Sequence, residues 1–89
     1  MKIRVKFLGT FFSVVNTDAI DLELMDGATV SDAFSALKRK FGKAFGEHAE
    51  RLDYLMVFVN NVEYRQLQGQ ETILRQGDSL TLGHVAAGG

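Results

Sequence analysis

The chain has 89 residues, of which 46% are hydrophobic and 24% are charged, as expected for one small domain with a single core. Ten Lys and Arg against eleven Asp and Glu give a net charge of -1. Such a chain has no summed positive field, so neither nucleic acid nor an anionic membrane is expected as a partner. The absence of cysteine excludes disulfides, thiolate metal sites and a cysteine nucleophile.

The first 24 residues predict two paired strands. Residues 1–8 alternate between apolar and basic side chains, and residues 20–24 alternate between apolar and acidic ones. This period of two is typical of half-buried strands, and the opposite charges of the two outer faces favour antiparallel pairing across a connection over residues 9–18. Because the chain opens on this alternation instead of an apolar signal segment, we expect a cytoplasmic protein.

The spacing of apolar side chains over residues 29–41 predicts one main helix. Thr29 followed by Asp32 approximates a capping box, and three basic residues at 38–40 suit the negative end of the helix dipole. Gly42 then provides a stop. Residues 43–53 fit either a short second helix or a loop.

The second half of the chain predicts three more strands. Residues 54–59 form a continuous apolar run, and Asn60–Asn61 suits a turn into a short strand over residues 62–64. A turn at residues 76–78 leads into a last alternating strand. We therefore expect an α+β fold, a mixed sheet of four to five strands packed on one main helix, which resembles the ubiquitin-like β-grasp.

Motifs for autonomous catalysis are missing from the sequence. It contains no glycine-rich nucleotide-binding pattern, and no serine lies in a nucleophile elbow. His48 and His84 lack neighbours at metal-ligand spacing, so each is interpreted as an ordinary surface histidine. We expect no catalytic residue, no metal site and no bound cofactor.

The last five residues have a different character. Val85-Ala86-Ala87-Gly88-Gly89 carries no charged side chain, and its side chains shrink toward the end. Five extended residues reach roughly 17 Å, and glycine can enter a channel too narrow for a Cβ atom. We therefore divide the chain into a domain over residues 1–84 and a flexible tail over residues 85–89.

Three features together resemble the MoaD/ThiS family of ubiquitin-like sulfur carriers. They are the order of elements, the segment LQGQETILRQGD at residues 67–78, and the ending VAAGG. Within that family the likeness is closest to the small subunit of molybdopterin synthase. The resemblance implies that an E1-like enzyme uses ATP to adenylate Gly89, and that sulfur then converts the carboxylate to a thiocarboxylate. Ala87 and Gly88 would form the slender approach to that enzyme.

The resemblance also implies partners and a pathway. The chain would be the non-catalytic, sulfur-donating subunit beside the large catalytic subunit of molybdopterin synthase, in molybdenum or tungsten cofactor biosynthesis. Alternatives are a protein modifier or a carrier for tRNA thiolation, and, in another class, a noncovalent β-grasp interaction module. Leu82-Gly83-His84 stands where family members commonly have aromatics and prolines, which leaves the receiving partner open.

A partner surface is expected beside the tail. Leu55, Val57 and Val59 can face the helix, which leaves Met56 and Phe58 on the opposite face of the sheet. We predict that Met56 and Phe58, together with Leu82 and Val85, form this surface. The alternative is that residues 43–53 or Phe11–Phe12 cover the two side chains.

Overall fold

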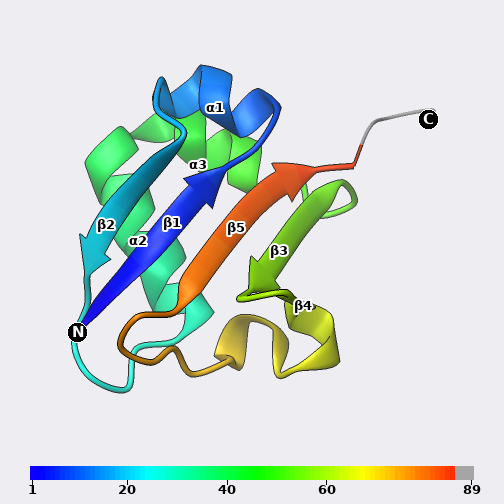
Figure 1. The fold of residues 1–89 in the computed structure, drawn as a ribbon. Helices are drawn as coiled ribbons and strands as arrows, with labels where there is room; N and C mark the ends of the chain where they lie inside the picture. The colour runs from blue at the N-terminus through cyan, green and yellow to red at the C-terminus, as the bar shows by residue number, and fades with distance from the viewer. Residues whose placement is uncertain (86–89) are drawn as a thin grey trace.

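A five-stranded mixed sheet carries the main helix on one face in the computed structural model, which describes residues 1–85 (Figure 1). The strand order is β2-β1-β5-β3-β4, and β1 and β5 are parallel while the other neighbours are antiparallel. This confirms the predicted β-grasp. The strands are β1 (Lys2–Phe7), β2 (Ala19–Glu23), β3 (Leu55–Val59), β4 (Val62–Glu63) and β5 (Ser79–His84); the helices are α1 (Thr10–Val15), α2 (Val30–Phe41) and α3 (Lys43–Ala49).

The alternation in the sequence sets which face of the sheet is buried. In β1 every second side chain is buried, and in β3 Leu55, Val57 and Val59 are buried while Met56 and Phe58 are only partly buried. The predicted register of β3 is therefore confirmed. Opposite charges do meet on the open face of the sheet, which is the face without helices. There Arg4 Nη2 and Asp21 Oδ1 of the antiparallel β1–β2 pair lie 3.3 Å apart.

The main helix begins and ends as the sequence predicts. The backbone N–H of Asp32 donates to Thr29 Oγ1 at 3.2 Å, and the Thr29 N–H donates to Asp32 Oδ2 at 2.9 Å. This capping box satisfies donors that the first turn would otherwise leave unpaired. The helix ends at Gly42, whose φ of 85° is readily adopted only by glycine.

Helix α1 lies where the sequence analysis expected only a connection. Its six residues bring Phe11 into the core, where the side chain is completely buried against Phe45 and both histidines. Asn16 ends the helix in the left-handed conformation. Burial of one large aromatic ring stabilises a segment that is too short to be helical on its own.

Two further segments settle or change the sequence-based interpretation. Of the two alternatives for residues 43–53, the short helix forms, as α3, and it buries Phe45. Tyr64 was expected in the short strand but begins a 3₁₀ turn (Tyr64–Gln66) and is buried. A second such turn (Gly69–Glu71) follows.

The segment before β5 is tied to the start of the main helix. The Leu74 N–H donates to the Ala28 carbonyl at 2.8 Å, and the Val30 N–H donates to the Thr72 carbonyl at 3.0 Å. Leu74 is buried beneath this short bridge. Over residues 1–85, none of the helices has both the length and the apolar character needed to cross a membrane.

Replacing Phe34 by Ala tests the packing of α2 on the sheet. Phe34 is buried against the core, so its truncation is expected to lower the free energy of unfolding by about 2–5 kcal/mol. Ser35 on the same helix is exposed, and Ser35→Ala is expected to change it by less than about 0.5 kcal/mol. Denaturant unfolding of both variants checks this, and a wild-type midpoint for Phe34→Ala would mean that the helix is misplaced.

Candidate functional site

The tail leaves the domain at the end of β5, the middle strand of the sheet. β5 pairs with β1 on one side and with β3 on the other. Beyond the strand, the Val85 N–H still donates to the Tyr54 carbonyl at 2.7 Å, so the first residue of the tail is held to the domain (Figure 1). Ala87, Gly88 and Gly89 lie outside the described residues, and their predicted roles remain predictions.

Apolar side chains gather on the open face of the sheet beside this point. Gly83 lies between Leu8 and Met56, and a Cβ atom added at Gly83 would be 3.5 Å from Leu8 Cβ and 3.5 Å from Met56 Cε. Phe58 lies on the same face, two residues from Met56 along β3. We call Leu8, Met56, Phe58 and Gly83 the apolar strip. Because Leu8 is 50% exposed and Met56 and Phe58 are only partly buried, the strip can contact a partner.

The two segments named as alternative covers for these side chains lie on the other side of the sheet. Phe11 packs against His84, whose side chain is on the helix side of β5, opposite Met56 and Phe58. Helix α3 packs against α1 and α2 on that same side (Figure 1). The alternative in which residues 43–53 or Phe11–Phe12 cover the open face is therefore wrong.

One residue of the predicted partner surface belongs to the core instead. Leu82 has no exposed surface, because the register aligns it with Phe7 on one side and Val57 on the other, both of which face α2. Val85, in contrast, is 51% exposed. The partner surface is therefore corrected by removing Leu82 and adding Leu8 and Gly83.

We call the point at Val85 where the tail leaves the domain the tail root. Both histidines lie beside it, on the helix side of the sheet. Their ring centroids are 4.1 Å apart, and both rings contact the edge or face of Phe11. His84 Nε2 donates to the His48 carbonyl at 3.0 Å, and His48 Nε2 lies 2.8 Å from Thr10 Oγ1. Both histidines are partly exposed, and the fold brings their rings together as a tilted pair, which the interpretation of each as an ordinary surface histidine did not anticipate.

The surroundings of this pair disfavour positive charge on His48. Partial burial, followed by the nearby His84 and then Arg51, lowers the pKa of His48 below its usual range. With Gly9, Thr10, Tyr54 and Val85, these three residues line a hollow of about 540 Å³, which we call the tail-root hollow. A cationic or hydrogen-bonding surface therefore lies on one side of the tail root, and the apolar strip lies on the other.

Among residues 1–85 the structure assembles no set of groups for autonomous catalysis. The Thr10 hydroxyl and the His48 imidazole are placed as a nucleophile and a base would be, but no carboxylate among the described residues orients the imidazole as the third group of a triad would. Within the same residues, no three His, Asp or Glu side chains are grouped to hold a metal ion. What the described part of the molecule offers is surfaces around a tail.

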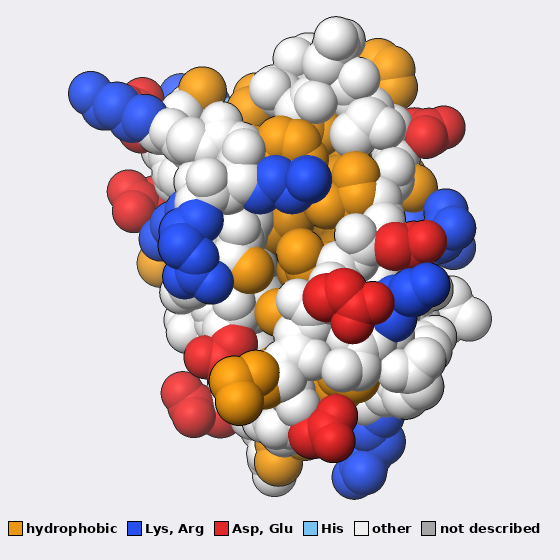
Figure 2. Space-filling model, turned by 90° about the vertical axis from the view of Figure 1, so that its left-hand side faces the viewer, with side chains coloured by type: hydrophobic (Ala, Val, Ile, Leu, Met, Phe, Trp, Pro, Cys, Tyr) orange, Lys and Arg blue, Asp and Glu red, His pale blue; other side chains and the backbone are white. Residues whose placement is uncertain are grey.

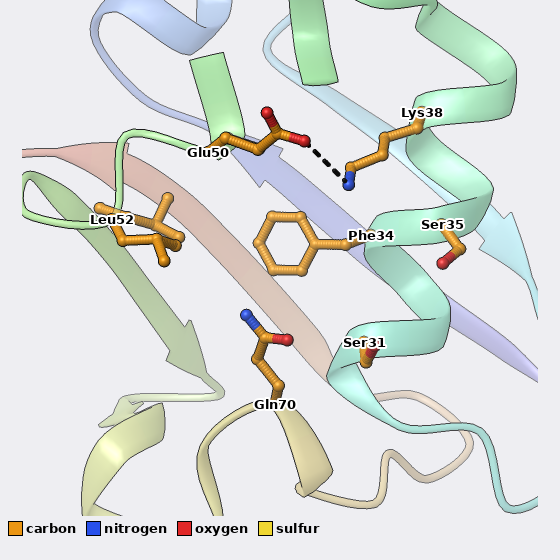
Figure 3. Close-up of a pocket in the computed structure, with 9 residues that line it drawn as sticks. Ser31, Phe34, Ser35, Lys38, Glu50, Leu52 and Gln70 are labelled. Atoms are coloured by element: carbon orange, nitrogen blue, oxygen red, sulfur yellow. Dashed lines mark ion pairs between the residues drawn. The ribbon is translucent and has the colours of Figure 1, made fainter. Parts of the chain in front are cut away.

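Another hollow, of about 180 Å³, opens over Phe34 between α2 and the loop that leads into β3 (Figure 3). An ion pair between Lys38 Nζ and Glu50 Oε1, 3.6 Å apart, spans its rim, and Gln70 approaches from the opposite side. Ser31 and Ser35 line the hollow without a histidine beside them. It therefore provides no activated nucleophile, and it does not include the residues of the tail root.

A third apolar region lies far from the tail. Figure 2 shows hydrophobic side chains exposed in a groove between the helices and the sheet, with Lys, Arg, Asp and Glu around it. The partly buried apolar residues that pack against the core are Met1, Val14, Ile20, Leu24, Ala36 and Phe41. Strand β2 forms the edge of the sheet away from β3, so this groove is separated from the apolar strip.

Sequence reasoning missed two features of the tail root. Leu8 continues the alternating set of Lys2, Arg4 and Lys6, so the period of two already placed it on the open face. The histidine pair left no comparable signal. It depends on α1 and α3 meeting beside the end of β5, and neither position has neighbours at ligand spacing in the sequence.

Comparisons with known proteins bear on the whole chain. The model of the ThiS family matches residues 5–89. Small archaeal modifier protein 3 of Haloferax volcanii is 30% identical over 92 residues, with 100% of both chains covered. The solution structure of small archaeal modifier protein 1 from Methanosarcina acetivorans has a TM-score of 0.84 at 22% identity and covers 99% of this chain and 96% of that one.

A complex of two proteins is also similar in fold. In the complex of subunits 1 and 2 of molybdopterin-converting factor from Helicobacter pylori, one chain matches with a TM-score of 0.66 at 17% identity, with 100% of both chains covered. A protein of this fold thus occurs in a complex with another subunit.

The lowered pKa of His48 predicts a pH dependence of stability. In the unfolded chain the pKa of His48 should be near 6.5, which is higher than its pKa in the folded protein. Near and just below pH 6.5 the unfolded state therefore binds more protons than the folded state, so the free energy of unfolding falls as the pH drops through this range. We expect His48→Gln to reduce the loss of stability between pH 7.5 and 5.5. Denaturant unfolding at both pH values measures it, and equal losses in the two proteins would contradict the prediction.

Proposed function

Because this chain belongs to the ThiS family of ubiquitin-like sulfur carriers, we propose that its last residue, Gly89, is activated as an acyl adenylate and converted to a thiocarboxylate. The observation that carries the proposal is the uncharged ending VAAGG, placed directly after a strand that the sheet holds on both sides. A tail held at Val85 and free of bulky side chains suits insertion into the active site of another enzyme.

The chemistry requires no catalytic group on this chain. A carboxylate is a poor electrophile at neutral pH, so an E1-like enzyme would join it to AMP from ATP and release pyrophosphate. A donor of sulfide-level sulfur then displaces AMP, which exchanges one carboxylate oxygen for sulfur. The carrier's own task is to present its end.

We assign the thiocarboxylate to sulfur donation in molybdopterin biosynthesis, with the large synthase subunit as receiving partner. The likeness in fold to a molybdopterin-converting factor complex supports this assignment. The apolar strip supports a protein partner on the open face. ATP would be held by the activating enzyme and not by this chain.

A second candidate function is protein modification with the same tail. The relative from Haloferax volcanii, 30% identical, is named a modifier protein, which favours this candidate. Activation of Gly89 is common to both functions, and only the acceptor differs. Recovery of the tail in an amide bond to lysine of another protein would favour modification over sulfur donation.

Shortening or thickening the tail tests the proposed activation. Deletion of Gly89 or the substitution Gly88→Val is expected to reduce adenylation by the E1-like enzyme at least about a hundredfold, measured as ATP–pyrophosphate exchange. The melting temperature should not change, since these residues follow the last strand. Full activation of the chain that lacks Gly89 would refute the proposal.

A change in the apolar strip serves as the contrast. Phe58→Ser alters the open face and leaves the tail intact, so it should weaken partner binding without changing the identity of the activated residue. A noncovalent interaction module would differ in its response to the tail variants. Its partner binding would be lost on Phe58→Ser and would be indifferent to both tail variants.

A further inference from the structure

The tail-root hollow combines cationic and hydrogen-bonding groups without any acidic one. Arg51, His48 and His84 line it together with Thr10 and Tyr54, and no Asp or Glu is among its lining residues. Arg51 is exposed and, within residues 1–85, has no carboxylate within the 4.0 Å distance of an ion pair. The hollow therefore presents a cationic guanidinium whose natural complement is an anion.

The acidic residues of the neighbouring elements do not line this hollow. Glu47 Oε1 of α3 lies 3.7 Å from Lys43 Nζ, and Glu50 Oε1 lies 3.6 Å from Lys38 Nζ. Asp53 and Glu50 line an adjoining hollow that Arg51 also lines, but neither forms an ion pair with Arg51 within 4.0 Å. Helix α1, strand β3 and the rest of β5 contain no charged residue. Arg51 and the two imidazoles thus set the charge that this hollow presents.

We propose that the tail-root hollow binds an Asp or Glu carboxylate of the E1-like enzyme that activates the tail. Val85 lines the hollow and is also the point where the tail leaves, so any protein that surrounds the tail must lie close to Arg51. The planar guanidinium of Arg51 matches a carboxylate, and the imidazoles add positive charge when they are protonated. The identity of the partner rests on the proposed function, whereas the existence of the anion site does not.

Binding of a carboxylate should be linked to proton uptake by the histidine pair. Two imidazoles with centroids 4.1 Å apart and Arg51 nearby repel one another when charged, and an anion offsets this repulsion. The protonated pair therefore binds a carboxylate more tightly than the neutral pair does. Affinity should rise as the pH falls from about 8 to about 6, while the ligand stays ionised.

Titration of the His48 imidazole by NMR tests the site directly, with acetate as the probe. At equal ionic strength, about 200 mM acetate is expected to raise the titration midpoint of His48 by about half a pH unit relative to chloride. Arg51→Ala should remove most of this difference. The matched control is Arg39→Ala, which removes an exposed arginine from α2 and should leave the difference unchanged.

Three results would overturn the proposal. They are equal midpoints in acetate and chloride, an undiminished acetate effect in Arg51→Ala, and an effect of inorganic phosphate that acetate does not reproduce, which would assign the hollow to phosphate instead. None of these results depends on activation of Gly89. Failure of the anion site is thus distinguishable from failure of the carrier function, which the tail variants test.

The partner is tested with the E1-like enzyme. Arg51→Glu places a negative charge at the rim and is expected to weaken the complex about tenfold at pH 6.5, whereas Arg39→Glu should change its Kd less than twofold. The wild-type complex should be tighter at pH 6.5 than at pH 8. Equal weakening by the two arginine variants would contradict docking at this hollow.

Discussion

The double pairing of β5 is the constraint on which the rest of the structure depends. Parallel hydrogen bonds to β1 and antiparallel ones to β3 hold the strand on both edges. The Val85 N–H, bound to the Tyr54 carbonyl, extends this support one residue beyond the strand. A central strand cannot shift its register without turning Leu80 and Leu82 out of the core, so the point where the tail leaves is fixed by the hydrophobic core itself.

Around that point the two faces of the sheet have different chemistry. The open face presents the apolar strip, and the helix side presents the tail-root hollow with its histidine pair and Arg51. An apolar contact contributes mainly burial, whereas a charged contact contributes orientation and a dependence on pH and salt. Together they would let a partner recognise the domain as well as the tail, which is important because a short uncharged ending carries little information by itself.

Periodicity made the sheet, the main helix and the open face predictable from the sequence. The alternation in β3 correctly placed Met56 and Phe58 opposite Leu55, Val57 and Val59, and the spacing of Thr29 and Asp32 predicted the capping box. Features that depend on tertiary contacts were not predictable in this way. Helix α1 exists because Phe11 is buried between other aromatic rings, and the histidine pair exists because α1, α3 and β5 meet.

Leu82 illustrates the limit of reasoning from alternation alone. The pattern in β5 separates its two sets of side chains but does not say which set faces the helix. The pairing of Leu82 with Phe7 and Val57 decides it, and those partners are far apart in the sequence. The prediction of a carrier, in contrast, came from a family resemblance, which combined the glycine ending with the order of elements and the segment at residues 67–78.

The intact mass of the wild-type protein tests the central claim most directly. After incubation with an E1-like enzyme, ATP and a sulfur donor, the account predicts a gain of about 16 Da, the difference between sulfur and oxygen, located at Gly89 by fragmentation. An enzyme that thiocarboxylates its own carrier under the same conditions provides the positive control. An unchanged mass, or a gain located anywhere but the last residue, would contradict the account.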